Sequence, residues 1–196
     1  MAAPSVVFWF RKGLRLKDNK ALVRALEEGK KRNASVCYPI FVLDPHFGSA
    51  VGSNRWRFLM ESLDDLNSSL MKLDSRLLVI RGSPEETIPS LLKKWNVQVL
   101  GFEVDSEPYA LKRDANIEKV CTKAKVHCVS TSGHTLFDLE TLKTAAKLKE
   151  GDWIKAYRSM TTLIDKMGPP EVPLDEPTVI PSLPEGKEFL DGLESE

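Results

Sequence analysis

The stretch VVFWFRKGLRLKDNKAL, residues 6–22, decides which class of fold the sequence can adopt. It begins with an uninterrupted apolar run at residues 6–10, which is typical of a strand covered on both faces. Four Lys or Arg side chains follow within residues 11–17, and the Asp-Asn pair at residues 18–19 precedes a helical pattern. The stretch therefore predicts a buried strand that leads through a basic loop into a helix.

The same unit recurs along the chain. Five apolar runs are predicted to be strands: SVVFWF at 5–10, SVCYPIFVL at 35–43, SRLLVIRG at 75–82, VQVLGFEV at 97–104 and KVHCVST at 125–131. Strands without polar alternation, each followed by an amphipathic helix, belong to parallel sheets with right-handed crossovers. The sequence predicts an α/β domain that is Rossmann-like and doubly wound, with a five-stranded parallel sheet and helices on both faces.

Local signals predict where several helices begin and end. Ser83 is predicted to be an N-cap, with Pro84 at the first helical position and Glu86 placed to complete a capping box. Ser106 is predicted to cap the helix that follows the fourth strand. Gly29 is predicted to end the first helix, because the apolar stripe of that helix stops there.

Length and charge limit the domain organisation and the classes of function. The 196 residues are 42% hydrophobic, which fits one globular domain with a real core. Basic and acidic residues number 28 each, so no net charge would hold the molecule on nucleic acid or on an anionic membrane. The two ends nevertheless differ in sign. Residues 1–32 hold nine Lys or Arg against three acids, and residues 170–196 hold one Lys against eight acids.

A stop signal, Gly-Pro-Pro at residues 168–170, predicts a boundary near the C-terminus. We expect the α/β domain to span residues 1–168 and a Pro-rich, acidic linker or tail to span residues 169–196. The tail contains six prolines and few apolar residues, so it is predicted to be mobile or extended and not to pack on the domain.

Cysteine and histidine usage indicates the compartment and argues against a metal site. Cys37, Cys121 and Cys128 form no CxxC pair and lie in predicted core elements, which indicates reduced, buried thiols in a cytoplasmic or nuclear protein. The apolar run near the N-terminus is too short for a signal or membrane anchor, so no membrane association is expected. The three histidines are scattered, and no zinc-finger spacing occurs.

The basic loop after the first strand should lie at the carboxyl ends of the strands, where doubly wound sheets bind ligands. Two interpretations stay open for Arg11 and Arg15. They could meet an anion, a cofactor or an acidic neighbouring domain, or they could pair with nearby carboxylates such as Asp18 and fix the loop. The acidic cluster EVDSE at residues 103–107 could likewise be a helix start or the polar wall of a pocket.

Several familiar active sites are excluded because their sequence motifs are absent. The first strand is not followed by GxGxxG, and no GxxxxGK[ST] phosphate loop occurs. The segment SGHT at residues 132–135 lacks the G-x-S-x-G frame of a nucleophile elbow and is predicted to be a turn. The residue chemistry alone gives no catalytic set.

The exact amino-acid sequences of six segments are more informative than their composition. FWFRKGLRLKDNKAL, YPIFVLDP, GSNRWRFLMESLDDLNSSL, SRLLVIRGSPEETIPSLLKKW, DSEPYALKRD and HTLFDL occur in this order. In sequence and spacing they resemble the N-terminal α/β domain of the cryptochrome/photolyase family, and most of all its animal cryptochrome and (6-4) photolyase branch. The resemblance covers residues 5–170. The segment KTAAKLKEGDWIKAYRSMTTLI at 143–164 departs from the family pattern, which puts the docking of its helix in doubt.

The resemblance implies a blue-light photoreceptor or DNA photolyase in which a second, helical domain binds FAD and performs the photochemistry. The sequence ends before that domain, so we expect no catalytic residue and no enzymatic activity from this chain alone. The family activity would be deoxyribodipyrimidine or (6-4) photolyase. Trp9, Trp56, Trp95 and Trp153 are expected to be core residues and not members of the family's electron-transfer chain.

The resemblance also implies a possible antenna chromophore, 8-hydroxy-5-deazaflavin or methenyltetrahydrofolate, at the carboxyl ends of the strands. The candidate contacts carried over by position are Phe10, Arg11, Leu43, Asp44, Arg55, Phe58, Leu59, Glu103 and Asp105. The expected partner is an FAD-binding domain, or another protein, on the exposed interdomain face. Two alternatives remain open: a stand-alone nucleotide-binding α/β domain and a protein-interaction module.

Overall fold

The structure is a computed structural model that describes residues 2–45, 51–149, 152, 154–186, 188–191 and 193. Its strands are β1 (Ser5–Phe10), β2 (Val36–Leu43), β3 (Leu78–Arg81), β4 (Val97–Glu103) and β5 (His127–Thr131). Its helices are α1 (Lys20–Lys31), α3 (Ser53–Met71), α4 (Pro84–Lys94), α5 (Pro108–Ala124), α6 (Leu139–Ala145), α7 (Tyr157–Met167) and the short 3₁₀ helix η1 (Glu188–Leu190).

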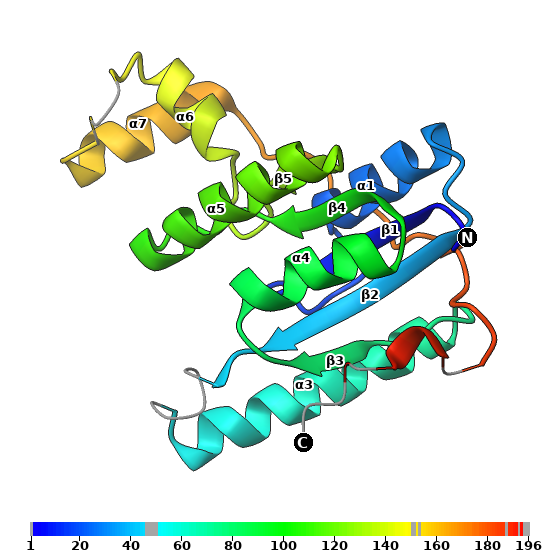
Figure 1. The fold of residues 1–196 in the computed structure, drawn as a ribbon. Helices are drawn as coiled ribbons and strands as arrows, with labels where there is room; N and C mark the ends of the chain where they lie inside the picture. The colour runs from blue at the N-terminus through cyan, green and yellow to red at the C-terminus, as the bar shows by residue number, and fades with distance from the viewer. Residues whose placement is uncertain are drawn as a thin grey trace.

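The predicted sheet is confirmed. Its five strands lie in the order β3-β2-β1-β4-β5, and every neighbouring pair is parallel (Figure 1). β1 is central, with β2 on one side and β4 on the other, so the chain changes direction across the sheet at β1. In a doubly wound fold, the ends of β1 and β4 therefore border the expected ligand crevice.

Helices cover both faces of the sheet, and each face has its own core. α4 and α5 pack on one face, and α1 and α3 pack on the other. The first core includes Trp9, Tyr38, Ile88, Trp95, Phe102 and Ile117. The second core includes Val6, Phe8, Phe10, Leu22, Leu63 and Leu66. Residues of β1 alternate between the two cores, which explains why its apolar run has no polar interruption.

α1 begins where the sequence predicts, but it continues past Gly29. The Asn19 side chain caps the helix by accepting a hydrogen bond from the Leu22 amide at 2.9 Å. Gly29 is a buried residue inside the helix. A larger residue does not fit there, because a Cβ would overlap the side chain of Val6 in the adjacent strand. The prediction that Gly29 ends α1 is therefore wrong, and close helix-to-strand packing is the reason for the glycine.

Two further cap predictions need correction. Ser83 is the N-cap residue of α4 and Pro84 follows as its first residue, but the Ser83 side chain makes no capping hydrogen bond. The Glu86 amide instead donates to the Ser83 carbonyl at 3.2 Å, so no reciprocal capping box forms. The N-cap of α5 is Glu107 and not Ser106, since Pro108 occupies the first helical position.

α6 and α7 differ from the other described α-helices because neither has a buried residue. In Figure 1 the pair lies at the upper left, above α5 and apart from the sheet. α7 begins at Tyr157, so Ile154 of the segment that departs from the family pattern precedes this helix. Trp153 lies outside the described residues, while Trp9 and Trp95 are buried as predicted and Trp56 is only half-buried.

The described part of the C-terminal segment, residues 169–186, 188–191 and 193, contradicts the prediction that this segment does not pack on the domain. Ile180 is only 2% exposed and belongs to the second core, and the Cys37 amide donates to the Pro181 carbonyl at 3.1 Å. Phe189 packs on the first core, where its carbonyl accepts a hydrogen bond from the Trp95 indole at 2.9 Å. The segment thus crosses from one face of the sheet to the other.

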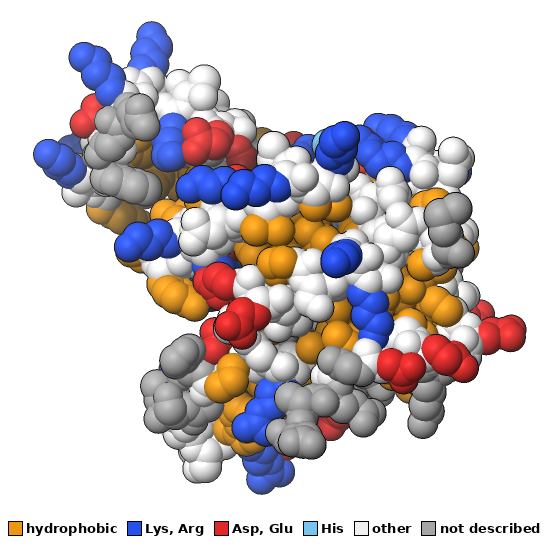
Figure 2. All heavy atoms as spheres, viewed as in Figure 1, with side chains coloured by type: hydrophobic (Ala, Val, Ile, Leu, Met, Phe, Trp, Pro, Cys, Tyr) orange, Lys and Arg blue, Asp and Glu red, His pale blue; other side chains and the backbone are white. Residues whose placement is uncertain are grey.

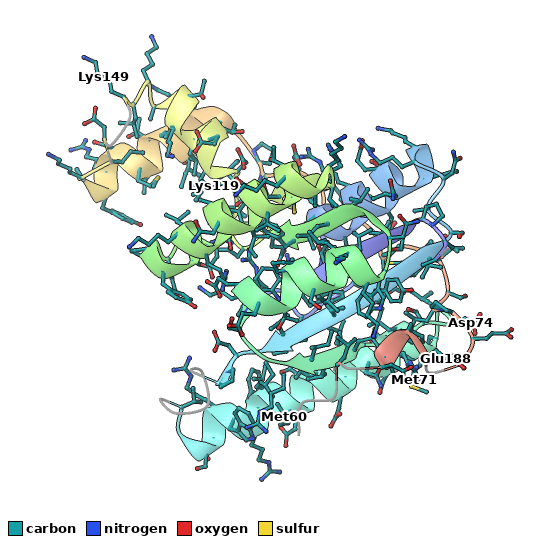
Figure 3. All side chains as sticks on the ribbon, viewed as in Figure 1. Met60, Met71, Asp74, Lys119, Lys149 and Glu188 are labelled. Carbon is teal, nitrogen blue, oxygen red and sulfur yellow. The ribbon has the colours of Figure 1, made fainter. Side chains whose placement is uncertain are left out.

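Its first and last parts are also fixed. The Leu174 amide donates to the Asp18 carboxylate at 3.2 Å, and the Asp18 amide donates to the Leu174 carbonyl at 2.8 Å. Figure 3 shows Glu188 of η1 at the end of the molecule that also holds Met71 and Asp74, which end and follow α3. A few apolar anchors and backbone hydrogen bonds therefore hold a segment whose average composition resembles a disordered linker.

Candidate functional site

The basic loop after β1 meets acidic residues at the carboxyl ends of β1 and β4. Arg11 is buried, with a side chain only 8% exposed. Its guanidinium donates to the Asp114 carboxylate of α5 at 2.5 Å and to the backbone carbonyl of Glu103 at the end of β4. Arg113 donates to the same Asp114 oxygen at 3.0 Å. We call Arg11, Arg113 and Asp114 the arginine clasp.

Aromatic rings enclose this clasp. The Arg11 guanidinium carbon lies 4.8 Å from the centre of the Trp9 ring and 4.7 Å from that of Phe102, and Arg113 lies 4.9 Å from Trp9. Burial lowers the pKa of Arg11, and the hydrogen bond and charge of Asp114 oppose that change. Arginine still carries its charge at neutral pH, so Arg11 is a buried cation held by one carboxylate and two rings.

A second acidic residue occupies a space made by two glycines. Glu103 is 7% exposed, and its side chain lies against both Gly13 and Gly133. A Cβ at either glycine would overlap the Glu103 carboxylate, so both loops can approach the end of β4 only as glycine. One carboxylate oxygen, Oε1, is buried and accepts no hydrogen bond from the described residues.

Lys12 forms ion pairs with two acidic residues at the outer edge of this region. Its ammonium group lies 3.0 Å from Asp105 and 2.8 Å from Glu107, and the hydrogen bond with Glu107 raises its pKa. Burial acts to raise the pKa of Asp105, but hydrogen bonds from the Glu107 amide and from Lys12 lower it overall. Asp105 therefore stays ionised, and its bond to the Glu107 amide orders the chain just before α5.

The cavity in this region is small. It measures about 10 Å³ and is lined by Arg11, Lys12, Glu103, Val104, Asp105 and His134. That volume is about the room that one water molecule needs. A drug-sized ligand occupies a pocket of roughly 300 Å³ or more. Ion pairs and glycine contacts thus leave little free space beside Arg11, Glu103 and Asp105.

The two interpretations of the basic loop apply to different arginines. Arg15 is exposed, lies 3.8 Å from the Asp18 carboxylate, and donates to the carbonyls of Asp18 and Gly133. The predicted pairing with Asp18 is thus found for Arg15, whereas for Arg11 it is wrong, because Arg11 turns inward to Asp114. Both arginines tie the loop after β1 to neighbouring segments. This is the second of the two interpretations, in which the arginines fix the loop.

The remaining predicted contacts fall into two groups. Phe10 is buried at 1% exposure in the second core, and Leu59 of α3 packs against that core. Leu43 and Asp44 are half-buried at the end of β2, while Arg55 and Phe58 are exposed on the first turns of α3. Phe58 is 73% exposed. The structure therefore brings Arg11, Glu103 and Asp105 together, and leaves Arg55 and Phe58 on open surface.

Sequence reasoning missed Asp114 and Gly133, which complete the region. Asp114 had a detectable signal, because a charged residue lies at the helical spacing of the apolar face of α5. The buried positions of this face are Ala110, Asp114, Ile117 and Cys121. A carboxylate at such a position requires a buried cation. Gly133 had no comparable signal, because only the approach of Glu103 shows why it must be glycine.

The described residues contain no group of three or more His, Cys, Asp or Glu side chains arranged to hold a metal ion. In the part of the chain that the structure describes, no helix has the length and apolar character needed to span a membrane.

Comparison with known proteins identifies the family. The sequence profile described as DNA photolyase matches residues 6–175, most of the chain. The chain belongs to the DNA photolyase family. It is 44% identical over 173 residues to cryptochrome-1 of Spalax judaei and 45% identical over 170 residues to cryptochrome-2 of Gallus gallus. These alignments cover 87% and 86% of this chain but 28% of each relative, so the chain corresponds to little more than a quarter of their length.

Solved structures of photolyase-family proteins share the fold. A Synechocystis cryptochrome superposes with a TM-score of 0.78 at 24% identity, over 96% of this chain and 41% of the other. A bacterial class III photolyase from Agrobacterium tumefaciens gives 0.76 at 24% identity, over 95% and 36%. An archaeal photolyase from Sulfolobus tokodaii gives 0.68 at 22% identity, over 92% and 38%, and was solved with two FAD molecules that its description links to a novel light-harvesting cofactor. The predicted family and fold are confirmed.

Proposed function

We propose that this chain serves as the α/β domain of a light-responsive photolyase-family protein, and that its main task is to dock against a flavin-binding helical domain. Its similarity to cryptochrome-1 and cryptochrome-2 over about a quarter of their length supports an origin in such an assembly. In this proposal, light-driven chemistry belongs to the flavin-binding domain, and the α/β domain is not catalytic alone.

The absence of buried residues in α6 and α7 is the observation on which this docking role rests. α7 carries Met160, Ile164 and Met167 at helical spacing, and all three are only half-buried. Tyr157 is 85% exposed, and Leu136, in the loop before α6, is 67% exposed. Figure 2 shows apolar side chains on this projecting part of the molecule, between Lys and Arg side chains. An apolar surface rimmed by charge is typical of a protein interface.

In our proposal, the part of the strand-end crevice beside Arg11, Glu103 and Asp105 holds no antenna chromophore. A molecule such as 8-hydroxy-5-deazaflavin or methenyltetrahydrofolate exceeds a cavity of about 10 Å³ many times over. Its polar edge would have to displace Arg11 from Asp114, or Lys12 from Asp105. We therefore propose that the crevice is a closed structural junction, and that a flavin binds in the partner domain. The three free thiols support a reducing compartment, the cytoplasm or the nucleus.

Titration calorimetry tests the docking proposal. The purified chain is titrated with the separately expressed flavin-binding domain of a cryptochrome-1 relative. We expect Tyr157→Ala to weaken binding about tenfold or more, since a buried interface Tyr contributes about 2 kcal/mol. Val172→Ala is the matched control, because Val172 is equally exposed at 84% but lies outside α6 and α7. Equal binding by both variants, or no binding by the unmodified chain, would contradict the proposal.

A spectrum tests the closed crevice. The chain is incubated with each antenna chromophore, passed through gel filtration, and its absorbance is recorded. We expect no visible or near-ultraviolet band to elute with the protein. A band of near-equal stoichiometry that persists after filtration would show that the crevice opens, and the proposal would then fail at this point while the docking role stands.

A further inference from the structure

Two exposed surfaces of this chain carry apolar side chains together with charges of opposite sign. One is α7 with the two residues before it, residues 155–167, which contain three Lys or Arg and one acid. The other is the stretch 171–179 of the C-terminal segment, which contains three acids and no Lys or Arg. We call them the basic surface and the acidic surface.

The basic surface is open to solvent. Tyr157 is 85% exposed, and the cations Lys155, Arg158 and Lys166 are also exposed. None of these three cations forms an ion pair with another described residue. Their charge is therefore available to a partner, and Figure 2 shows Lys and Arg side chains on this projecting part of the molecule.

The acidic surface is open as well. Val172, Leu174 and Val179 are 84%, 37% and 73% exposed. Asp175 and Glu176 are exposed, and neither forms an ion pair with another described residue. An apolar stretch bordered by charges is typical of an interaction surface.

Within one molecule the two surfaces stay apart. The Asp18 amide donates to the Leu174 carbonyl at 2.8 Å, and the Leu174 amide donates to the Asp18 carboxylate at 3.2 Å. Glu171 pairs with Lys20 of α1. These contacts fix the acidic surface beside the start of α1 while Tyr157 of α7 stays exposed, so contact between the two surfaces requires a second molecule.

We propose that the chain forms a symmetric dimer in which the basic surface of each molecule binds the acidic surface of the other. Opposite charges attract across such a contact and disfavour the pairing of like surfaces. Tyr157 offers an aromatic anchor, and Val172 and Leu174 offer apolar partners for it. Pro173 and Pro177 restrict the acidic surface before binding, which reduces the entropy lost on association. Two-fold symmetry uses both surfaces of both molecules and leaves none uncovered.

The dimer and the docked assembly would exclude each other, because both use α7. A flavin-binding domain that covers Tyr157 would displace the second copy of the chain. This competition rests on the proposed function. Self-association does not, and the chain alone tests it.

Sedimentation velocity over a range of protein concentrations, at low ionic strength, tests the dimer. We expect the mass of the unmodified chain to rise with concentration from that of a monomer to that of a dimer. High salt should weaken the association, because it screens exposed charges. Two variants each reverse one surface, Lys155→Glu with Arg158→Glu and Asp175→Lys with Glu176→Lys. Each should raise the dissociation constant about tenfold or more, since like charges then face each other.

A mixture of the two variants is the decisive sample. In a symmetric dimer that contains one of each, the reversed basic surface meets the reversed acidic surface, and the two unchanged surfaces meet each other. The mixture should therefore regain the association that each variant alone has lost. This recovery would also show that both variants are folded.

Lys72→Glu with Lys93→Glu is the matched control, because both lysines are exposed at the ends of α3 and α4 and the net charge changes equally. The control should associate like the unmodified chain. An unmodified chain that stays monomeric at every concentration, a control that dissociates as readily as the variants, or a mixture that stays monomeric would each overturn the proposal. Particles larger than a dimer would also overturn it, since open arrays lack two-fold closure.

Discussion

Residues 169–193 have the prolines and acids of a linker, yet Ile180 is 2% exposed and Phe189 packs against Tyr38 and Trp95. α7 has an amphipathic stripe typical of a packed helix, yet none of its residues is buried. The contrast between these two segments shows that average composition does not decide burial. A segment packs when a few side chains meet a complementary surface, and the sheet offers that surface to the C-terminal segment and not to α7.

The largest effect should come from removing the C-terminal segment. Deletion of all residues after Pro170 removes Ile180 and Phe189 from the two cores and the carbonyl partner of the Cys37 amide. Losing a buried Ile alone costs about 2–5 kcal/mol. We expect the melting temperature to fall by about 10 °C, because 1 kcal/mol corresponds to roughly 2–4 °C in a domain of this size. A change below about 2 °C in a thermal melt would show that the segment is not part of the fold.

The same contrast between packed and exposed residues exists inside the first loop. Arg11→Gln leaves Asp114 buried with only Arg113 as a charged partner, and breaking a buried pair costs about 3–5 kcal/mol. Arg15→Gln is the control, since Arg15 is exposed and its pair with Asp18 contributes less than about 1 kcal/mol. Urea unfolding of both variants measures the difference. Equal losses of stability would contradict the burial of the clasp.

Two adjacent residues give the sharpest test within the C-terminal segment. Ile180→Ala should lower the free energy of unfolding by about 2–4 kcal/mol, because it leaves a cavity in the second core. Val179→Ala should change it by less than about 0.5 kcal/mol, because Val179 is 73% exposed. Chemical denaturation compares the two. If both variants lose the same free energy of unfolding, Ile180 is not specifically packed in the second core and the segment lies on the surface.

A smaller effect should depend on pH. Glu171 pairs with Lys20 near the start of the segment, and that hydrogen bond lowers the pKa of Glu171. A carboxylate with a lowered pKa adds stability above its unfolded pKa, about 4.3, and this stability is lost as pH falls through the lower folded value. Glu171→Gln should therefore reduce the melting temperature slightly at pH 7 and not at low pH. High salt should also remove the difference, because the pair is exposed.

The smallest effect should be on α7. Tyr157→Ala should leave the free energy of unfolding within about 0.5 kcal/mol of the unmodified chain, since Tyr157 is 85% exposed. The same variant should weaken docking, so stability and binding would separate. A loss above about 1 kcal/mol in a urea melt would mean that α7 packs on the domain, and the proposed interface would lose its basis.

The sheet could be predicted because its signal lies in every strand. Uninterrupted apolar runs, each followed by a helical stripe, predict a parallel, doubly wound sheet, and the five strands lie where the runs predict. The helix caps were harder. Ser83 and Ser106 have the right side chains, but backbone and proline geometry at the helix starts decides which residue caps and whether its hydroxyl bonds.

The strand-end region could be predicted only in part. The sequence placed Arg11, Glu103 and Asp105 at the same edge of the sheet, which the structure confirms. It could not show that Arg11 turns to Asp114, since that pairing joins residues 103 positions apart. Nor could it show that the C-terminal segment packs, because two anchors, Ile180 and Phe189, hardly change the composition of a segment rich in proline and acid.

Backbone ¹⁵N relaxation of the amides at residues 179, 180, 182 and 183 tests most directly whether the C-terminal segment is an integral part of the fold. We expect order parameters of about 0.8 or above, like those of the strands, because Ile180 is buried and Pro181 accepts a hydrogen bond from β2. Values below about 0.6 at these residues would contradict it and would restore the mobile tail that the composition predicts.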